Sequence, residues 1–142
     1  MSKFSWFGLV MSLVLLLGGT VALADDPAAT EWQAVIAGQI QAFRDHDAPA
    51  ALSFASAEFH KTFPDPNDFF IAIINSGYTP IMTSRSQTFG PYQLVAPDKV
   101  LQEVKLTGND QNIYEAVYQL SKEADGWRVH SVQLVKVPGL GV

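Results

Sequence analysis

The residues of this sequence that could carry chemistry begin with Asp45-His46-Asp47, its densest group of titratable side chains. Carboxylates and imidazoles bind metal ions and transfer protons, so the group would suit a metal site or an acid–base pair. One histidine between two aspartates is not a specific ligand spacing, however, and Asp47 stands where it can cap a helix that has Pro49 in its first turn. We therefore interpret the group as a polar turn between helices, and we predict no catalytic residue, no metal site and no bound cofactor.

A second set of candidates consists of tyrosines, whose hydroxyl groups could orient a ligand on the concave face of a sheet. Tyrosines whose rings pack in the core and whose hydroxyl groups reach solvent would occupy the same positions in the sequence, so an ordinary structural role is the alternative. Gln102 is more informative, because it interrupts an otherwise apolar strand face and must either find a hydrogen-bond partner or line a cavity. The residues that we predict to contact a ligand are Tyr78, Gln102, Tyr114, Tyr118 and Trp127.

The first half of the chain is expected to form helices that cover these residues. Apolar side chains recur at helical spacing from Trp32 to Phe43, and Thr30 to Gln33 has the form of a capping box at the start of this helix. Gly38, within the same helix, could permit the close approach of another element. Shorter helices are predicted over residues 48–55, 57–62 and 66–77, the last of them capped by Asp65 before Pro66. Tyr78-Thr79-Pro80 is expected to link the helices to the strands.

In the second half the apolar pattern changes to a period of two, which predicts strands. The last two strands form a hairpin that reverses at Asp125-Gly126, where glycine allows the tight turn. A bulge near Ser131 would let Val129 and Val132 both point inward, and it leaves the side of His130 undecided. The predicted strands are 83–95, 100–106, 113–120 and 127–135. Helices followed by an antiparallel meander make an α+β domain, with N-terminal helices packed on a curved antiparallel sheet.

The first 24 residues are typical of an export signal. Lys3 precedes an apolar run from Trp6 to Leu17, and Ala22-Leu23-Ala24 has the small-x-small form of a cleavage site. An uncleaved membrane anchor is the alternative, although glycines dilute the end of the run. We expect cleavage after Ala24, which would leave a single domain over residues 25–142 that is periplasmic or secreted and has no stable membrane anchor.

Charge and cysteine content exclude several classes of function. Fourteen acidic residues against nine basic ones give a net charge of −5, and no basic cluster offsets this balance. Such a chain is repelled by phosphate backbones, so nucleic acid is not an expected partner. The sequence contains no cysteine, which removes thiol nucleophiles, disulfide exchange and thiolate metal sites.

Short motifs spread over the expected domain resemble known families. In the helical start these are Ile36, Gln39, Ile40, Phe43, Asp47, Ala51 and Phe54, and in the closing strand they are Gly126-Trp127-Arg128-Val129. Both stretches are similar to ketosteroid-isomerase-like proteins, the cone-shaped superfamily also named after nuclear transport factor 2. More narrowly, the chain resembles a bacterial family known as domain of unknown function 4864. The matching pieces are Gln39-Ile40-Gln41-Ala42-Phe43, Phe54-Ala55, Phe69-Phe70, Tyr78-Thr79-Pro80-Ile81, Tyr118-Gln119-Leu120 and Gly126-Trp127-Arg128-Val129.

The resemblance implies a helix-covered curved sheet, a fold that hosts isomerases, dehydratases and non-catalytic binding modules. Catalysis of the ketosteroid-isomerase kind needs a carboxylate inside the apolar pocket, whereas Glu103 and Glu115 fall on the outer face of the predicted sheet. We therefore expect a non-enzymatic domain that binds a small apolar or amphipathic ligand or a protein partner. The alternatives are an isomerase or lyase with Asp47 or His60 as base and Tyr78 or Tyr118 as acid, or an interaction domain without a pocket, and a homodimer is left open.

Overall fold

The computed structural model describes residues 20–22 and 28–138, so the apolar run of the expected leader and residues Leu23 and Ala24 lie outside the described residues. The helices precede the four long strands, and only the short strand β1 comes before them in the described ranges, which confirms the predicted α+β class. No helix in these described ranges is long and apolar enough to cross a membrane. The helical half comprises α1 (Ala29–Arg44), α2 (Ala48–Ser53), α3 (Ala57–Thr62), α4 (Pro66–Ile73), the π-helical turn η2 (Ile74–Tyr78) and α5 (Thr79–Thr83).

The starts of the helices agree with the predicted caps in two cases and differ in one. The Asp47 carboxylate accepts a hydrogen bond from the Ala50 N–H at 3.1 Å and thereby caps α2, and Asp65 caps α4 in the same way. The capping box predicted at Thr30 is wrong, because α1 begins earlier and its N-cap position, Ala28, makes no side-chain cap. The Gln33 amide instead reaches the sheet, as described below.

The end of α4 also differs from the prediction. The backbone does leave helical geometry at Gly77, where φ is +99°, a value that glycine adopts without strain. The chain then forms one more short helix, α5, across residues 79–83, whereas Tyr78 to Pro80 was predicted to be a link without helix. Pro80 lies in the first turn of α5, the position at which proline favours a helix.

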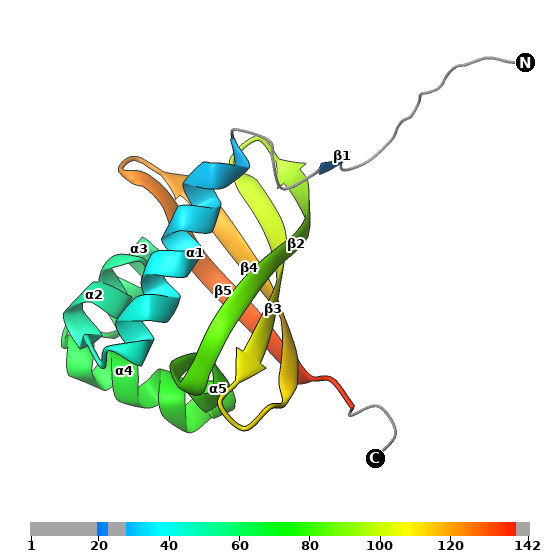
Figure 1. Ribbon diagram of the computed structural model, residues 1–142. Coiled ribbons are helices and arrows are strands. Elements are labelled where there is room, and N and C mark those ends of the chain that lie inside the picture. Colours follow the sequence, from blue (N-terminus) through cyan, green and yellow to red (C-terminus); the bar gives the residue numbers. More distant parts are fainter. Residues whose placement is uncertain (1–19, 23–27, 139–142) are drawn as a thin grey trace, which may run out of the picture.

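The strand half is an antiparallel meander that does not close into a barrel. Its four long strands lie in chain order, and the short β1 (Thr20–Ala22) pairs along the outer edge of β2. Figure 1 shows the sheet strongly twisted, with α1 lying across one of its faces and the shorter helices gathered at the lower end of α1. The long strands are β2 (Ser84–Ala96), β3 (Lys99–Gly108), β4 (Ile113–Glu123) and β5 (Gly126–Lys136).

The core lies between α1 and the inner face of this sheet. Alternate residues of the two central strands are buried, while Glu103, Lys105 and Glu115 on the opposite face are exposed, as the period-two pattern predicted. Close packing of the helices depends on Gly38, since a Cβ there would lie 2.5 Å from the Phe54 ring. The inward residues of β3 and β4 that are buried are Val100, Gln102, Val104, Leu106, Ala116, Tyr118 and Leu120.

Candidate ligand-binding site

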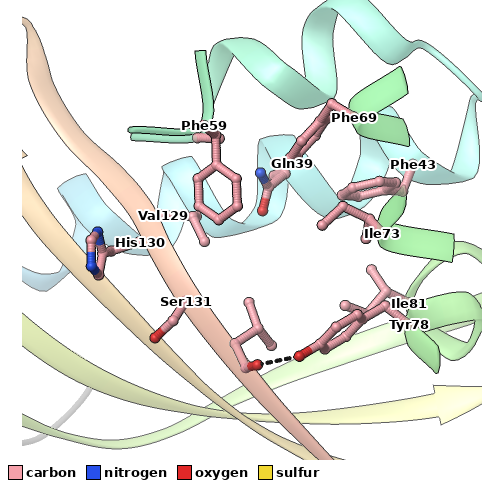
Figure 2. A pocket seen from close by; sticks show the side chains of 12 residues that line it. Gln39, Phe43, Phe59, Phe69, Ile73, Tyr78, Ile81, Val129, His130 and Ser131 are labelled. Atoms are coloured by element: carbon pink, nitrogen blue, oxygen red, sulfur yellow. Dashed lines mark hydrogen bonds between the residues drawn. The ribbon is translucent and has the colours of Figure 1, made fainter. Parts of the chain in front are cut away.

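A cavity of about 220 Å³ lies between the helices and β5. Every helix except α2 contributes to its wall, and β5 supplies the strand side (Figure 2). Because most of the lining is apolar, the cavity suits a hydrophobic molecule better than hydrated ions. The lining residues are Gln39, Phe43, Ala55, Phe59, Phe69, Ile73, Tyr78, Ile81, Val129, His130, Ser131 and Val132.

Three phenylalanines from three different helices form one wall of the cavity. The ring centroid of Phe69 lies 6.2 Å from that of Phe43 and 5.7 Å from that of Phe59, the latter pair in an edge-to-face arrangement. Phe43 belongs to the apolar stripe of α1, and Phe69 follows the turn that Asp65 caps. Mutual ring packing holds the three side chains in place, so this wall is formed before any ligand arrives.

The strand side of the cavity is made by the predicted bulge. Leu120 pairs with Val129 and Gln119 pairs with Ser131, so His130 is the extra residue of β5. The bulge lies one residue from the predicted position, and it does let both Val129 and Val132 line the cavity. His130 and Ser131 are exposed lining residues, and they therefore mark the mouth of the cavity.

Tyr78 closes the far end of the cavity against β5. Its hydroxyl donates a hydrogen bond of 2.7 Å to the backbone oxygen of Val132, the bond drawn as a dashed line in Figure 2. That bond ties the region after α4 to the last strand of the sheet. Because the hydroxyl has one proton and donates it to Val132, the Tyr78 oxygen can act toward other groups only as an acceptor.

Gln39 is the most buried polar residue of the lining, at 5% exposure. Its Nε2–H donates to the backbone oxygen of Ala51 at 3.1 Å and so joins α1 to α2. The residue lies three positions after Ile36 and four before Phe43, which are both buried, so the spacing alone placed it on the inner face of α1. A polar residue on an apolar stripe was the signal that sequence reasoning passed over.

The family model for a domain of unknown function, DUF4864, matches residues 25–142. The chain belongs to the DUF4864 family. This match covers all of the helices and the four long strands that build the cavity. No curated protein matches the chain.

In this DUF4864 domain only Tyr78, of the five residues predicted to contact a ligand, lines the cavity. Trp127 is buried elsewhere, with its ring edge-to-face on Trp32 at a centroid distance of 5.3 Å. Tyr114 is half-buried against the core, outside the cavity lining. Tyr118 is buried in the sheet, where loss of hydration raises the pKa of its hydroxyl, and the nearby positive charge of Arg44 opposes that rise.

Gln102 does not line the cavity either. It is fully buried, and its amide oxygen accepts hydrogen bonds from the Trp32 indole at 2.8 Å and the Gln33 amide at 3.2 Å. Its amide nitrogen donates to the backbone oxygens of Gly90 and Glu103, each at 2.9 Å. Of the two roles that the sequence left open for Gln102, the DUF4864 structure shows the one that satisfies protein groups.

The titratable residues considered for catalysis are not brought together by the fold. Asp47 is an exposed helix cap and His60 is exposed on α3, and neither lines the cavity. Among the lining residues that the structure describes, none carries a carboxylate, and His130 contributes the one imidazole. The described part of the DUF4864 domain also contains no cluster of three or more side chains that could hold a metal ion.

Proposed function

We propose that this domain is a non-catalytic binding module that holds a small apolar or amphipathic molecule between its helices and β5. The observation that carries the proposal is an apolar cavity of about 220 Å³ with a preformed phenylalanine wall. An engineered apolar cavity of about 150 Å³ in another protein stays dry and binds benzene. A cavity of this size therefore suits a single ring with one or two substituents, or a short branched chain.

The chemistry of the lining favours binding over catalysis. The order of helices before an open antiparallel sheet supports kinship with the ketosteroid-isomerase-like cone, whose enzymes need an acid or base within the pocket. The lining residues offer an amide, a tyrosine hydroxyl that already donates to Val132, and an imidazole at the mouth. An isomerase or lyase would need a base in the interior of the cavity, whereas His130, the one group of this lining that could act as a base, lies at the exposed mouth.

We also propose that the protein is exported and cleaved after Ala24. Support comes from the charged, apolar and small-residue order of the first 24 residues and from the family match, which begins at Asp25. N-terminal sequencing of the protein purified from its own cells tests this directly. A mature chain that starts at Asp25 is expected, and an intact Met1 in the membrane fraction would refute the proposal.

Ligand binding is tested best with a variant that fills the cavity. Val132→Phe adds a ring to the cavity wall, whereas Val135→Phe makes the same change at an exposed position of the same strand. We expect toluene to raise the thermal midpoint of the native protein and of Val135→Phe, and to leave that of Val132→Phe unchanged. Equal responses of all three proteins would show that the cavity is not where the probe binds.

A further inference from the structure

The amide of Gln39 has one end engaged by the protein and the other end free. Its nitrogen donates to the Ala51 backbone oxygen, which fixes the orientation of the amide plane. Among the described residues no hydrogen bond is made to the amide oxygen, Oε1. In the described ranges the Ser56 hydroxyl is the one fully buried polar side-chain atom without a partner, so Oε1 is not fully buried and a donor placed in the cavity can reach this unpaired acceptor.

The position of this oxygen connects it to the cavity. Figure 2 shows the Gln39 amide between the rings of Phe59 and Phe69, with its oxygen turned toward the space that the lining residues enclose. Water could satisfy the acceptor in the empty protein, but a water molecule there would have apolar rings on two sides. A ligand group that donates to Oε1 would replace that water without leaving the oxygen unpaired.

The other polar groups of the lining point to the same kind of ligand. The Tyr78 hydroxyl donates its one proton to the backbone oxygen of Val132, and the Ser131 hydroxyl donates to the Gln119 amide oxygen at 3.3 Å. Both deep polar groups, Gln39 and Tyr78, therefore present acceptors to the cavity. At this inner end a carboxylate would meet these acceptors with no compensating donor, since the His130 imidazole lies at the exposed mouth, and an ammonium group would lose its hydration without a carboxylate to replace it.

We infer that the Gln39 amide oxygen selects ligands that carry one neutral hydrogen-bond donor, an alcohol, phenol or N–H group, on a small apolar body. This inference rests on the proposed function, since it names the class of molecule that the same cavity takes. Gln39 determines specificity in this scheme, and the phenylalanine wall supplies the apolar contact. An anionic group of the same size is disfavoured at the inner end of the cavity, where Gln39 and Tyr78 present acceptors.

Phenol and toluene are the probes that separate these contributions, because they have nearly the same shape and only phenol has a donor. Their dissociation constants are measured by calorimetry for the native protein and for Gln39→Met, which keeps the length of the side chain and removes the acceptor. We expect the variant to weaken phenol binding at least about fivefold more than toluene binding, the value of one hydrogen bond. Any general loosening of the fold affects both probes and cancels in the ratio.

Each result bears on one of the two proposals. Equal effects of Gln39→Met on both probes would overturn the donor selection and leave the binding function standing. Failure of the native protein to bind either probe would instead overturn the proposed function. If Gln39→Met does not fold, the ¹³C chemical shift of the Gln39 side-chain carbonyl in the native protein decides, because phenol should move it and toluene should not.

Discussion

The indole N–H of Trp32 donates to the amide oxygen of Gln102 across 2.8 Å, joining α1 to the middle of β3. The same glutamine holds two backbone oxygens with its nitrogen, so every polar atom of a fully buried side chain is paired. This arrangement gives the indole a partner inside an apolar core and fixes the height of α1 over the sheet. Gln102 is thus a structural residue of the fold.

Gln102→Leu should lower the free energy of unfolding by about 1–3 kcal/mol, because it leaves the buried Trp32 donor and the part-buried Gly90 oxygen without their partner. Urea denaturation measures the change. Gln33→Ala is the control, since Gln33 is half-buried and binds the same oxygen at 3.2 Å, so its loss should cost much less. A neutral Gln102→Leu would contradict this account.

Asp47→Asn and Asp47→Ala test the role assigned to the titratable turn. The cap on α2 needs an oxygen acceptor, which asparagine keeps, so Asp47→Ala should cost about 0.5–2 kcal/mol and Asp47→Asn clearly less. Thermal unfolding of the two variants gives the comparison. Ligand binding should survive in Asp47→Asn, and its loss at unchanged stability would assign the carboxylate a functional role instead.

Two buried serines should respond to the same substitution in different ways. The Ser56 hydroxyl is 1% exposed and has no partner among the described residues, so Ser56→Ala should be neutral or stabilising. The Ser84 hydroxyl donates to the Ile81 oxygen at 2.8 Å and accepts from Arg44, so Ser84→Ala should cost about 1–3 kcal/mol. Equal destabilisation in chemical denaturation would indicate a partner of Ser56 that the fold does not reveal.

Burial of Tyr118 predicts a loss of stability in alkali. Its pKa is raised in the folded protein, so ionisation of this tyrosine opposes folding once the unfolded chain can ionise, near pH 10. The stability is fully present below that pH and falls as the pH rises above it. Tyr118→Phe should flatten this decline in unfolding measurements between pH 8 and pH 11, and an unchanged slope would argue against the shift.

The fold was largely readable from local patterns, and the site was not. Period-two strands, the Asp47 and Asp65 caps and the bulge near Ser131 depend on residues close in sequence, and the structure contains all of them. The capping box at Thr30 failed, since a motif of that form also occurs inside a helix whose start lies earlier.

The site depends on which residues meet across the fold. Gln102 and Gln39 are both polar residues on apolar faces, and either could have lined a cavity. What distinguishes them is that the Trp32 indole lies opposite Gln102, whereas nothing donates to the oxygen of Gln39 among the described residues. That difference is set by the distance between α1 and two separate parts of the chain, which no local spacing encodes.

The attachment of β5 to the helices has a consequence for how the protein folds. The Val129 N–H donates to the Phe54 oxygen at 2.8 Å, and the Val129 oxygen accepts from the Ser56 N–H at 2.9 Å. The junction of α2 and α3 is therefore anchored by the last strand of the chain, and closing so long a loop costs entropy before any contact compensates it. During synthesis the helical half would reach its final packing only after the hairpin of β4 and β5 has left the ribosome, and the cavity would form in that last cooperative step.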